Sequence, residues 1–276
     1  MSTASISAAP VSAEGRRVVS RDEWIRERVA LLAEEKALTR QRDAVASRVR
    51  DLPWVKVEKS YLFDSPTGPV SLAGLFGERS QLIVYHFMFD PTWSQGCKSC
   101  SFIADHYDGI VVHLAQRDIS LVTVSKAPIE KIETFRTRMG WTFPWVSGAN
   151  NDFGRDYGVS FTDQELADGK SVYNFTIRPY PIRELPGLSV FARDEAGEIY
   201  HTYSTFARGL EDFLVAYRFI DLTPKGRDEA ENGGMGWLRH HDRYDGSPFV
   251  QPWEERPGIT GPVLASTPSS DAASRE

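Results

Sequence analysis

Hydrophobic and polar positions along the chain first indicate a long helix near the N-terminus. From Ser20 the sequence runs to about residue 50 without Gly or Pro, and Ser20 followed by Glu23 has the form of a capping box. Four apolar residues recur at every seventh position within charged surroundings: Trp24, Leu31, Leu38 and Val45. This pattern predicts a helix with a narrow apolar stripe. Packing of the stripe on its own domain is the simpler interpretation, and a helix-mediated homodimer is the alternative.

The middle of the chain alternates apolar runs with amphipathic segments. The expected elements, in order, are extended pieces at 54–59 and 61–63, a strand at 81–87, a helix at 97–116 with Gly109 as its weak point, a strand at 119–124, a helix from Pro128 to Gly140, a short strand at 143–146, a helical turn at 152–157, a hairpin of 188–193 and 199–203, and a last helix at 210–220. Parallel strands joined by right-handed crossovers and followed by a hairpin give a mixed sheet with helices on both faces. The order predicts an α/β protein with a thioredoxin-like fold.

The two ends of the chain differ in composition from the middle. Both are rich in small and polar residues and offer little apolar surface for folding. The predicted organisation is a disordered N-terminus at 1–17, a helix at 18–50, a thioredoxin-like domain at 51–225, a C-terminal extension packed on that domain at 226–257, and a disordered tail at 258–276.

Composition and charge exclude several classes of protein. With 276 residues and 41% hydrophobic content, the chain can bury a substantial core, which excludes a wholly disordered protein. The net charge of -6 argues against a nucleic-acid partner, since binding to phosphates favours a basic excess. No stretch reaches the roughly 18 apolar residues of a membrane span, and the N-terminus lacks a secretory pattern. We therefore expect a cytoplasmic protein with no membrane partner.

The only two cysteines, Cys97 and Cys100, are separated by two residues. This spacing is typical of redox-active dithiols and of metal sites. Cys97 follows the first central strand and begins the first crossover helix, where backbone N–H groups and the helix dipole favour a thiolate. Cys100, one turn later, is positioned to attack a mixed disulfide formed at Cys97. We predict that Cys97 is the nucleophile and Cys100 the resolving thiol, with no cofactor other than the Cys97–Cys100 disulfide.

Other residues are candidates for supporting roles. Lys98 adds a cation beside Cys97, although an exposed lysine is ordinarily only solvated. Trp93 is expected either to shield the dithiol or to offer a face to the substrate. Pro186 is the nearest candidate for the cis-proline that thioredoxin folds usually place beside the dithiol, and an ordinary turn proline is the alternative.

Four polar side chains are further candidates. Residues 237–244 form either a solvated tail or a cap that supplies His240 or His241 as a proton donor. Asp90 and Asp105 are candidate bases for the resolving thiol, and the sequence does not choose between them.

Several other functions use a pair of cysteines and are alternatives to disulfide exchange. A zinc site with His106 and His113 does not match finger spacing, and thioredoxin-like copper carriers space their cysteines differently. A thioredoxin-fold peroxidase is the nearest alternative, but Ser94 stands where the peroxiredoxin motif has threonine and Asp90 where it has proline. A non-catalytic interaction protein whose dithiol senses redox state is a third alternative.

One long stretch, YHFMFDPTWSQGCKSCSFIADH at 85–106, is similar to a thioredoxin-like bacterial family of unknown function whose members are predicted dithiol-disulfide oxidoreductases, related to the AhpC/TSA and thioredoxin superfamily. Shorter blocks share the resemblance, at 124–128, 138–145, 184–191, 201–209 and 222–227, so that it extends over about residues 24–244. It implies the fold and the dithiol but no particular substrate. The expected partners are a protein or small-molecule disulfide and an external thiol reductant, since the chain has no third cysteine.

Overall fold

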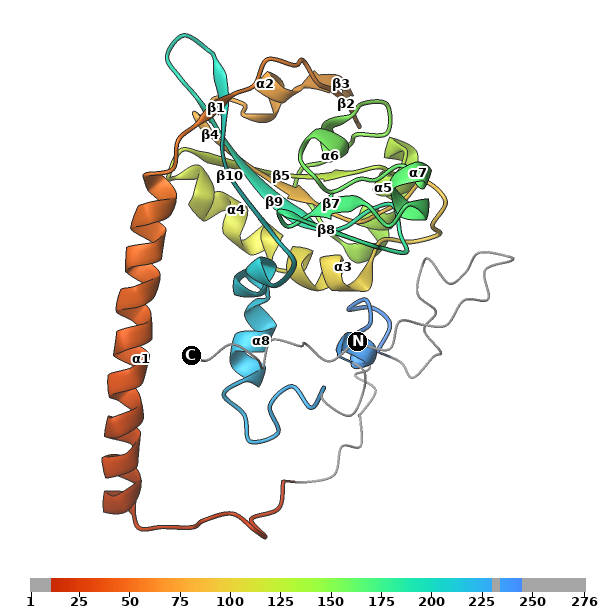
Figure 1. Ribbon diagram of the computed structural model, residues 1–276. Helices are drawn as coiled ribbons and strands as arrows, with labels where there is room; N and C mark the ends of the chain where they lie inside the picture. The colour runs from red at the N-terminus through yellow and green to blue at the C-terminus, as the bar shows by residue number, and fades with distance from the viewer. Residues whose placement is uncertain (1–10, 230–233, 245–276) are drawn as a thin grey trace.

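The computed structural model describes residues 11–229 and 234–244 (Figure 1). Its helices are α1 (Arg21–Arg50), α2 (Leu72–Leu75), α3 (Lys98–Ala104), α4 (Tyr107–Ala115), α5 (Ile129–Met139), α6 (Phe153–Asp156), α7 (Asp163–Ala167) and α8 (Val215–Ile220), with the 3-10 helices η1 (Ala207–Phe213) and η2 (Met235–Trp237). Its strands are β1 (Val55–Lys56), β2 (Leu62–Ser65), β3 (Gly68–Ser71), β4 (Gln81–His86), β5 (Ile119–Ser125), β6 (Trp145–Ser147), β7 (Ser171–Tyr173), β8 (Thr176–Arg178), β9 (Gly187–Arg193) and β10 (Ile199–Phe206). The predicted tail 258–276 and parts of the predicted segments 1–17 and 226–257 lie outside the described residues, so the domain boundaries stay predictions.

The central sheet has the strand order β1-β10-β9-β4-β5-β6-β2-β3. Strands β4, β5 and β6 are parallel, and β9 runs antiparallel to β4. The crossover from β4 to β5 passes through α3 and α4, and the hairpin β9–β10 adds to the other edge of β4. This is the thioredoxin-like arrangement that the sequence predicts, with β2, β3 and β6 added beyond β5. Strands β7 and β8 form a separate hairpin.

Alternation along β4 divides the interior between the two faces of the sheet. Tyr85 packs into a core with α3, α4, α5 and α8, and this core contains both cysteines. Leu82 and Val84 pack into a second core on the opposite face, against α2 and α6. The helices therefore cover both faces, as predicted, and the dithiol lies on the face of the larger aromatic core.

The expected helix 97–116 is two helices. The helix is interrupted at Asp105 and His106, between α3 and α4. It is not interrupted at Gly109, which lies inside α4. The Asp105 carboxylate accepts hydrogen bonds from Trp141 Nε1 at 2.9 Å and His241 Nδ1 at 2.6 Å. These tertiary contacts hold the turn at Asp105, and local sequence preference does not reveal them.

The predicted last helix also differs, because its first half is the 3-10 helix η1. Leu210, Leu214 and Tyr217 are buried as expected, but Phe213 is 38% exposed. The predicted strand 143–146 is observed as β6, which begins two residues later and ends one residue later.

The long helix α1 is present, and Ser20 accepts a hydrogen bond from the Glu23 N–H at its start. Glu23 pairs with Arg17 instead of completing the capping box. None of its residues is buried among the described residues, and the apolar stripe is about half exposed. The expectation that this stripe packs on its own domain is therefore wrong. Within residues 11–229 and 234–244, no helix has both the length and the apolar character needed to cross a membrane.

Candidate functional site

Both cysteines lie where the chain leaves β4 and enters α3. Cys97 is the N-cap residue of α3, and its N–H donates to the Met88 carbonyl at 3.1 Å. The Met88 N–H in turn donates to Cys100 Sγ at 3.5 Å. A Cβ at Gly96 would lie 2.6 Å from the Phe87 ring and 2.8 Å from the Phe135 ring, so only glycine fits before Cys97. The loop between β4 and α3 is thus fixed to the first turn of α3, because Met88 binds both Cys97 and Cys100.

The environment makes the two thiols unequal. A hydrogen bond from the Cys100 thiol does most to lower the pKa of Cys97 to about 7; burial opposes it, and the N–H groups of Cys100 and Ser99 assist. Lys98 makes the smallest of these contributions. Burial, and then the neighbouring Cys97, raise the pKa of Cys100 well above its usual value. Above about pH 7 the arrangement therefore favours a thiolate at Cys97 beside a protonated thiol at Cys100.

Three tyrosines that the sequence analysis did not identify surround Cys100. Burial raises the pKa of Tyr85 and Tyr107 well above the usual value, and the proximity of Cys100 raises it further. Cys100 also raises the pKa of Tyr173. Two groups oppose the rise in the pKa of Cys100 and favour its thiolate, the Tyr85 hydroxyl and the Met88 N–H. The only sequence signal for Tyr85 is its alternate position on β4, which places it on the α3 face.

The dithiol is almost completely covered, since Cys97 is 3% exposed and Cys100 1%. Residues 234–244, which we name the C-terminal strap, contact both sides of it. Lys98 Nζ donates to the Met235 carbonyl at 2.9 Å, and His240 Nε2 lies 2.9 Å from the Gly96 carbonyl. The strap therefore holds the residues directly before and after Cys97.

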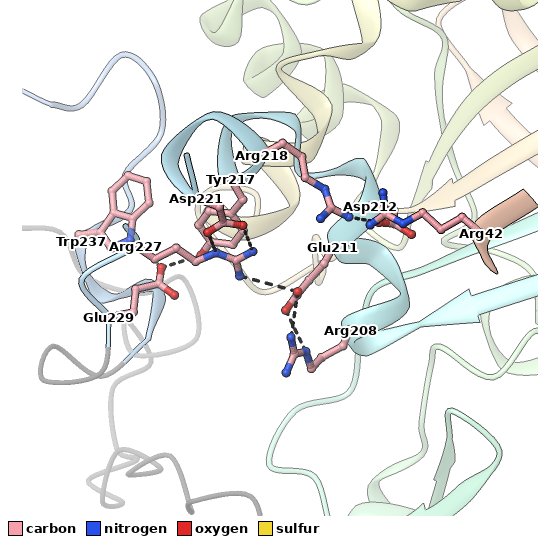
Figure 2. Close-up of polar contacts among 10 residues, drawn as sticks. All are labelled: Arg42, Arg208, Glu211, Asp212, Tyr217, Arg218, Asp221, Arg227, Glu229 and Trp237. Atoms are coloured by element: carbon pink, nitrogen blue, oxygen red, sulfur yellow. Dashed lines mark hydrogen bonds and ion pairs between the residues drawn. The ribbon is translucent and has the colours of Figure 1, made fainter. Parts of the chain in front are cut away.

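Further contacts anchor the strap beyond the dithiol. The Trp237 ring packs edge-on against Phe102 of α3 at 5.8 Å. Figure 2 shows Glu229 between two elements: its carboxylate accepts from Trp237 Nε1 at 2.7 Å and from the Tyr217 hydroxyl of α8 at 2.6 Å. Leu238 is fully buried. These contacts fix the strap to α3 and to α8 together.

His240 has both ring nitrogens engaged. Its Nδ1 lies 2.7 Å from Arg138 NH2, which can only donate, so Nδ1 accepts. Nε2 therefore carries the hydrogen and donates to the Gly96 carbonyl. Burial, with the Arg138 charge contributing, lowers the pKa of His240 to about 4. This neutral tautomer suits a residue that positions the loop. It does not suit the proton donor that the sequence analysis considered.

The predicted supporting residues Lys98 and Trp93 both lie at the dithiol. Lys98 is 4% exposed, so the expectation of a solvated side chain is wrong: its stem is buried and its ammonium group binds the strap. Trp93 is 1% exposed and packs in the same core as both cysteines. Trp93 therefore presents no face to solvent, and its expected shielding of the dithiol stays a prediction.

Pro186 lies directly before β9, which begins one residue earlier than predicted, at Gly187. No peptide bond in the described residues is cis, so the expectation of a cis-proline is wrong. The Pro186 carbonyl accepts a hydrogen bond from the Tyr173 hydroxyl at 2.7 Å, and the same hydroxyl accepts from the Ala207 N–H at 2.9 Å. The hairpin β7–β8 thus occupies the space beside Pro186.

The two candidate carboxylates are engaged elsewhere. Asp90 is buried and accepts from the backbone and the hydroxyl of Thr92. Asp105 binds Trp141 and His241, as described above. Among the described residues, no group of three or more His, Cys, Asp or Glu side chains is placed to hold a metal ion.

The acidity of Cys97 gives a testable pH dependence. Only the thiolate reacts with iodoacetamide, so we expect the alkylation rate of Cys97 to fall about tenfold per pH unit below its pKa and to level off above it. The midpoint should lie near pH 7, as the lowered pKa requires. The measurement is the rate of labelling at Cys97, assigned by mass spectrometry, across this range.

Two variants test the cause. Cys100→Ala, which removes the hydrogen bond that Cys100 donates to Cys97, should raise the midpoint more than Cys100→Ser. A midpoint near that of a free thiol would contradict this account of the site.

Comparison with known proteins gives one family match and several structural likenesses. The family model described as "Bacterial protein of unknown function (DUF899)" matches residues 13–244. No curated protein matches the sequence.

Among solved structures, the chain is similar to peroxidoxin BcpB from Mycobacterium tuberculosis, at 16% identity and a TM-score of 0.40, covering 61% of this chain and 97% of that chain. It is also similar to Xanthomonas campestris peroxiredoxin Q, at 15% identity and a TM-score of 0.42, covering 60% and 96%. A putative thiol:disulfide interchange protein DsbE from Chlorobium tepidum has 15% identity and a TM-score of 0.35, covering 60% and 97%.

Proposed function

Since the chain belongs to the DUF899 family of bacterial proteins of unknown function, we propose its activity from its own residues: a thiol-disulfide oxidoreductase whose redox-active pair is Cys97 and Cys100. The observation that carries the proposal is the placement of the two thiols, with Cys97 as the N-cap residue of α3 and Cys100 one turn later. Their surroundings lower the pKa of Cys97 and raise that of Cys100. A low-pKa thiol beside a protonated one is the arrangement that disulfide exchange requires.

The exchange proceeds in two steps. The Cys97 thiolate attacks one sulfur of a substrate disulfide, forms a mixed disulfide and releases the other sulfur as a thiolate that takes up a proton. Cys100 then loses its proton and attacks Cys97 Sγ, which forms the Cys97–Cys100 disulfide and releases the second substrate thiol. Two electrons pass from the protein to the substrate. An external thiol reductant must restore the dithiol, because the chain has no other cysteine.

Surrounding residues support different parts of this cycle. The N–H groups of Ser99 and Cys100 stabilise the attacking thiolate, and Tyr85 with the Met88 N–H favours the Cys100 thiolate in the second step. Both sulfurs are buried, and the strap binds the residues on either side of Cys97. Because both thiols are buried, we infer that the strap opens for a substrate to reach Cys97. A cytoplasmic location remains a prediction.

Burial also favours a second candidate, a thiol peroxidase. A peroxide is small enough to reach a thiol that a protein disulfide reaches only after the strap opens. Cys97 would then be oxidised to a sulfenic acid with release of an alcohol or water, and Cys100 would condense with it to the disulfide with loss of water. The departures at Ser94 and Asp90 from the peroxiredoxin motif count against this candidate.

One experiment separates the two candidates. The fully reduced protein is mixed separately with insulin, glutathione disulfide and hydrogen peroxide at equal concentrations, and formation of the Cys97–Cys100 disulfide is followed by loss of free thiols. We expect oxidation by one or both disulfides to be faster than oxidation by peroxide. Faster oxidation by peroxide would favour the peroxidase, and no disulfide formation with any of the three would reject both candidates.

A further inference from the structure

The helix α1 has little contact with the rest of the protein. Figure 1 shows that its C-terminal end reaches the level of the sheet, while the rest of the helix extends away from the sheet and past the level of α8. The Arg42 guanidinium lies 3.5 Å from Asp212 of η1, a contact also drawn in Figure 2. Successive helix residues are about 100° apart, so the side of the helix that contains Gln41 is open, and Leu38, one turn before Arg42, lies at the edge of this open side next to the Asp212 contact. On that open face three rows of residues run along the helix.

The three rows differ in size and charge. One is large and apolar, and its members are 47%, 49%, 52% and 52% exposed: Trp24, Leu31, Leu38 and Val45. One is small and exposed: Ala30, Ala37 and Ala44. The row between them changes from acidic to basic along the helix: Glu27, Glu34, Gln41 and Arg48. A 30-residue helix is about 45 Å long, so these rows form an extended surface.

We propose that this face of α1 docks a second copy of the chain, with the two α1 helices packed antiparallel about a two-fold axis near Leu38. An antiparallel pair related by a two-fold axis brings each row of one helix against the same row of its partner, in reverse order. The apolar row then matches Trp24 with Leu52 of the second copy, Leu31 with Val45, and Leu38 with itself. Leu52, just beyond the helix, is 44% exposed.

The same register matches the other two rows. Ala30 meets Ala44 of the second copy and Ala37 meets itself, so small side chains allow the helices to approach closely on that side. In the middle row Glu27 meets Arg48 and Glu34 meets Gln41. Glu27 Oε1 already binds Arg17, which leaves its second oxygen for Arg48. One register thus satisfies all three rows.

Charge selects the antiparallel over the parallel arrangement. A parallel pair would place Glu27 and Glu34 each beside its own copy, and Arg48 beside Arg48, at the centre of the contact. Like charges at facing positions are destabilising, and opposite charges specify the partner and its orientation. The charge change along the middle row therefore favours a second copy of this chain in reverse orientation.

The oligomeric state of the full chain tests the proposal by sedimentation equilibrium. Wild type should be a dimer, and Leu31→Glu/Leu38→Glu should be a monomer with unchanged circular dichroism and unchanged disulfide exchange.

Charge reversal tests the pairing of the middle row. Arg48→Glu should weaken dimerisation about tenfold, since it replaces the two attractive Glu27–Arg48 pairs by two repulsive ones. Adding Glu27→Arg to Arg48→Glu should restore it, since the pairs are then reversed and not removed. A monomeric wild type, or a dimer that the Leu31 and Leu38 changes leave intact, would overturn the proposal.

Single cysteines determine the orientation, in a Cys97→Ser/Cys100→Ser background. Leu38→Cys should cross-link under mild oxidation, because Leu38 meets itself at the two-fold axis. Gln41→Cys should not, because the antiparallel register separates the two copies of position 41 by about 10 Å along the axis. Lys36→Cys, on the opposite side of the helix, is the matched control. Cross-linking of Gln41→Cys as fast as Leu38→Cys would indicate a parallel pair and contradict the proposal.

Discussion

Cys97→Ser should lower disulfide exchange to the rate without protein, whereas Cys100→Ser should stop the reaction at the mixed disulfide. The reason is the unequal acidity of the two thiols: Cys97 has a pKa of about 7, and the pKa of Cys100 is raised well above its usual value. Serine at position 97 provides no thiolate for the first step. Serine at position 100 leaves the first step intact but cannot attack Cys97 Sγ in the second.

The measurement combines kinetics with trapping. Reduction of insulin gives the overall rate, and mass spectrometry of the Cys100→Ser protein incubated with glutathione disulfide detects a glutathione adduct at Cys97. Ser99→Ala is a matched control on the same turn, since it keeps the backbone N–H that faces Cys97. Full exchange activity in Cys97→Ser would remove Cys97 from the mechanism, and an adduct found instead at Cys100 in Cys97→Ser would reverse the two roles.

Leu238→Ala should increase the reactivity of Cys97 by loosening the strap. Leu238 is fully buried, and truncation of a buried leucine to alanine costs about 2–5 kcal/mol. A buried thiol reacts through the fraction of molecules in which its cover is open. Since about 1.4 kcal/mol corresponds to a factor of ten, we expect alkylation of Cys97 at neutral pH to become about 30-fold faster or more. The rate of iodoacetamide labelling at Cys97 measures the effect.

Leu72→Ala is the control for a general loss of stability. Leu72 is 3% exposed and belongs to the core on the opposite face of the sheet, so its truncation should cost a similar free energy without opening the strap. Its labelling rate should stay close to that of wild type in the absence of denaturant. Equal acceleration in both variants would mean that Cys97 reacts through global unfolding and that the strap is not the cover that opens.

Local patterns predicted most of the elements that form the sheet and place the dithiol. The apolar run of β4, the crossover helices and the Gly-containing turn of the β9–β10 hairpin are local signals, because each depends on residues adjacent along the chain. The position of Cys97 at a helix start followed from the same patterns. The sequence missed the hairpin β7–β8, whose three-residue strands are too short to show a periodicity.

The predictions that failed depended on contacts between distant segments. Lys98 has an ordinary surface composition around it, and its burial results from Met235, far away along the chain. The break at Asp105 depends on Trp141 and His241 in the same way. For α1 the apolar stripe was visible in the sequence, but whether its own domain covers it could be known only from the packing.

The sequence by itself determined that this is a thioredoxin-like chain with one pair of cysteines at the start of a helix, since strand order, helix start and cysteine spacing are all local properties. Only the tertiary structure decided how reactive and how accessible that pair is. The pKa of each thiol depends on burial and on hydrogen bonds, and the buried environment includes tyrosines from distant segments. Burial of the pair accompanies contacts with a strap more than 130 residues away, whose Met235 carbonyl is bound to Lys98. The thiol pKa values and the access to the dithiol therefore depend on residues that come into contact only when the chain has folded.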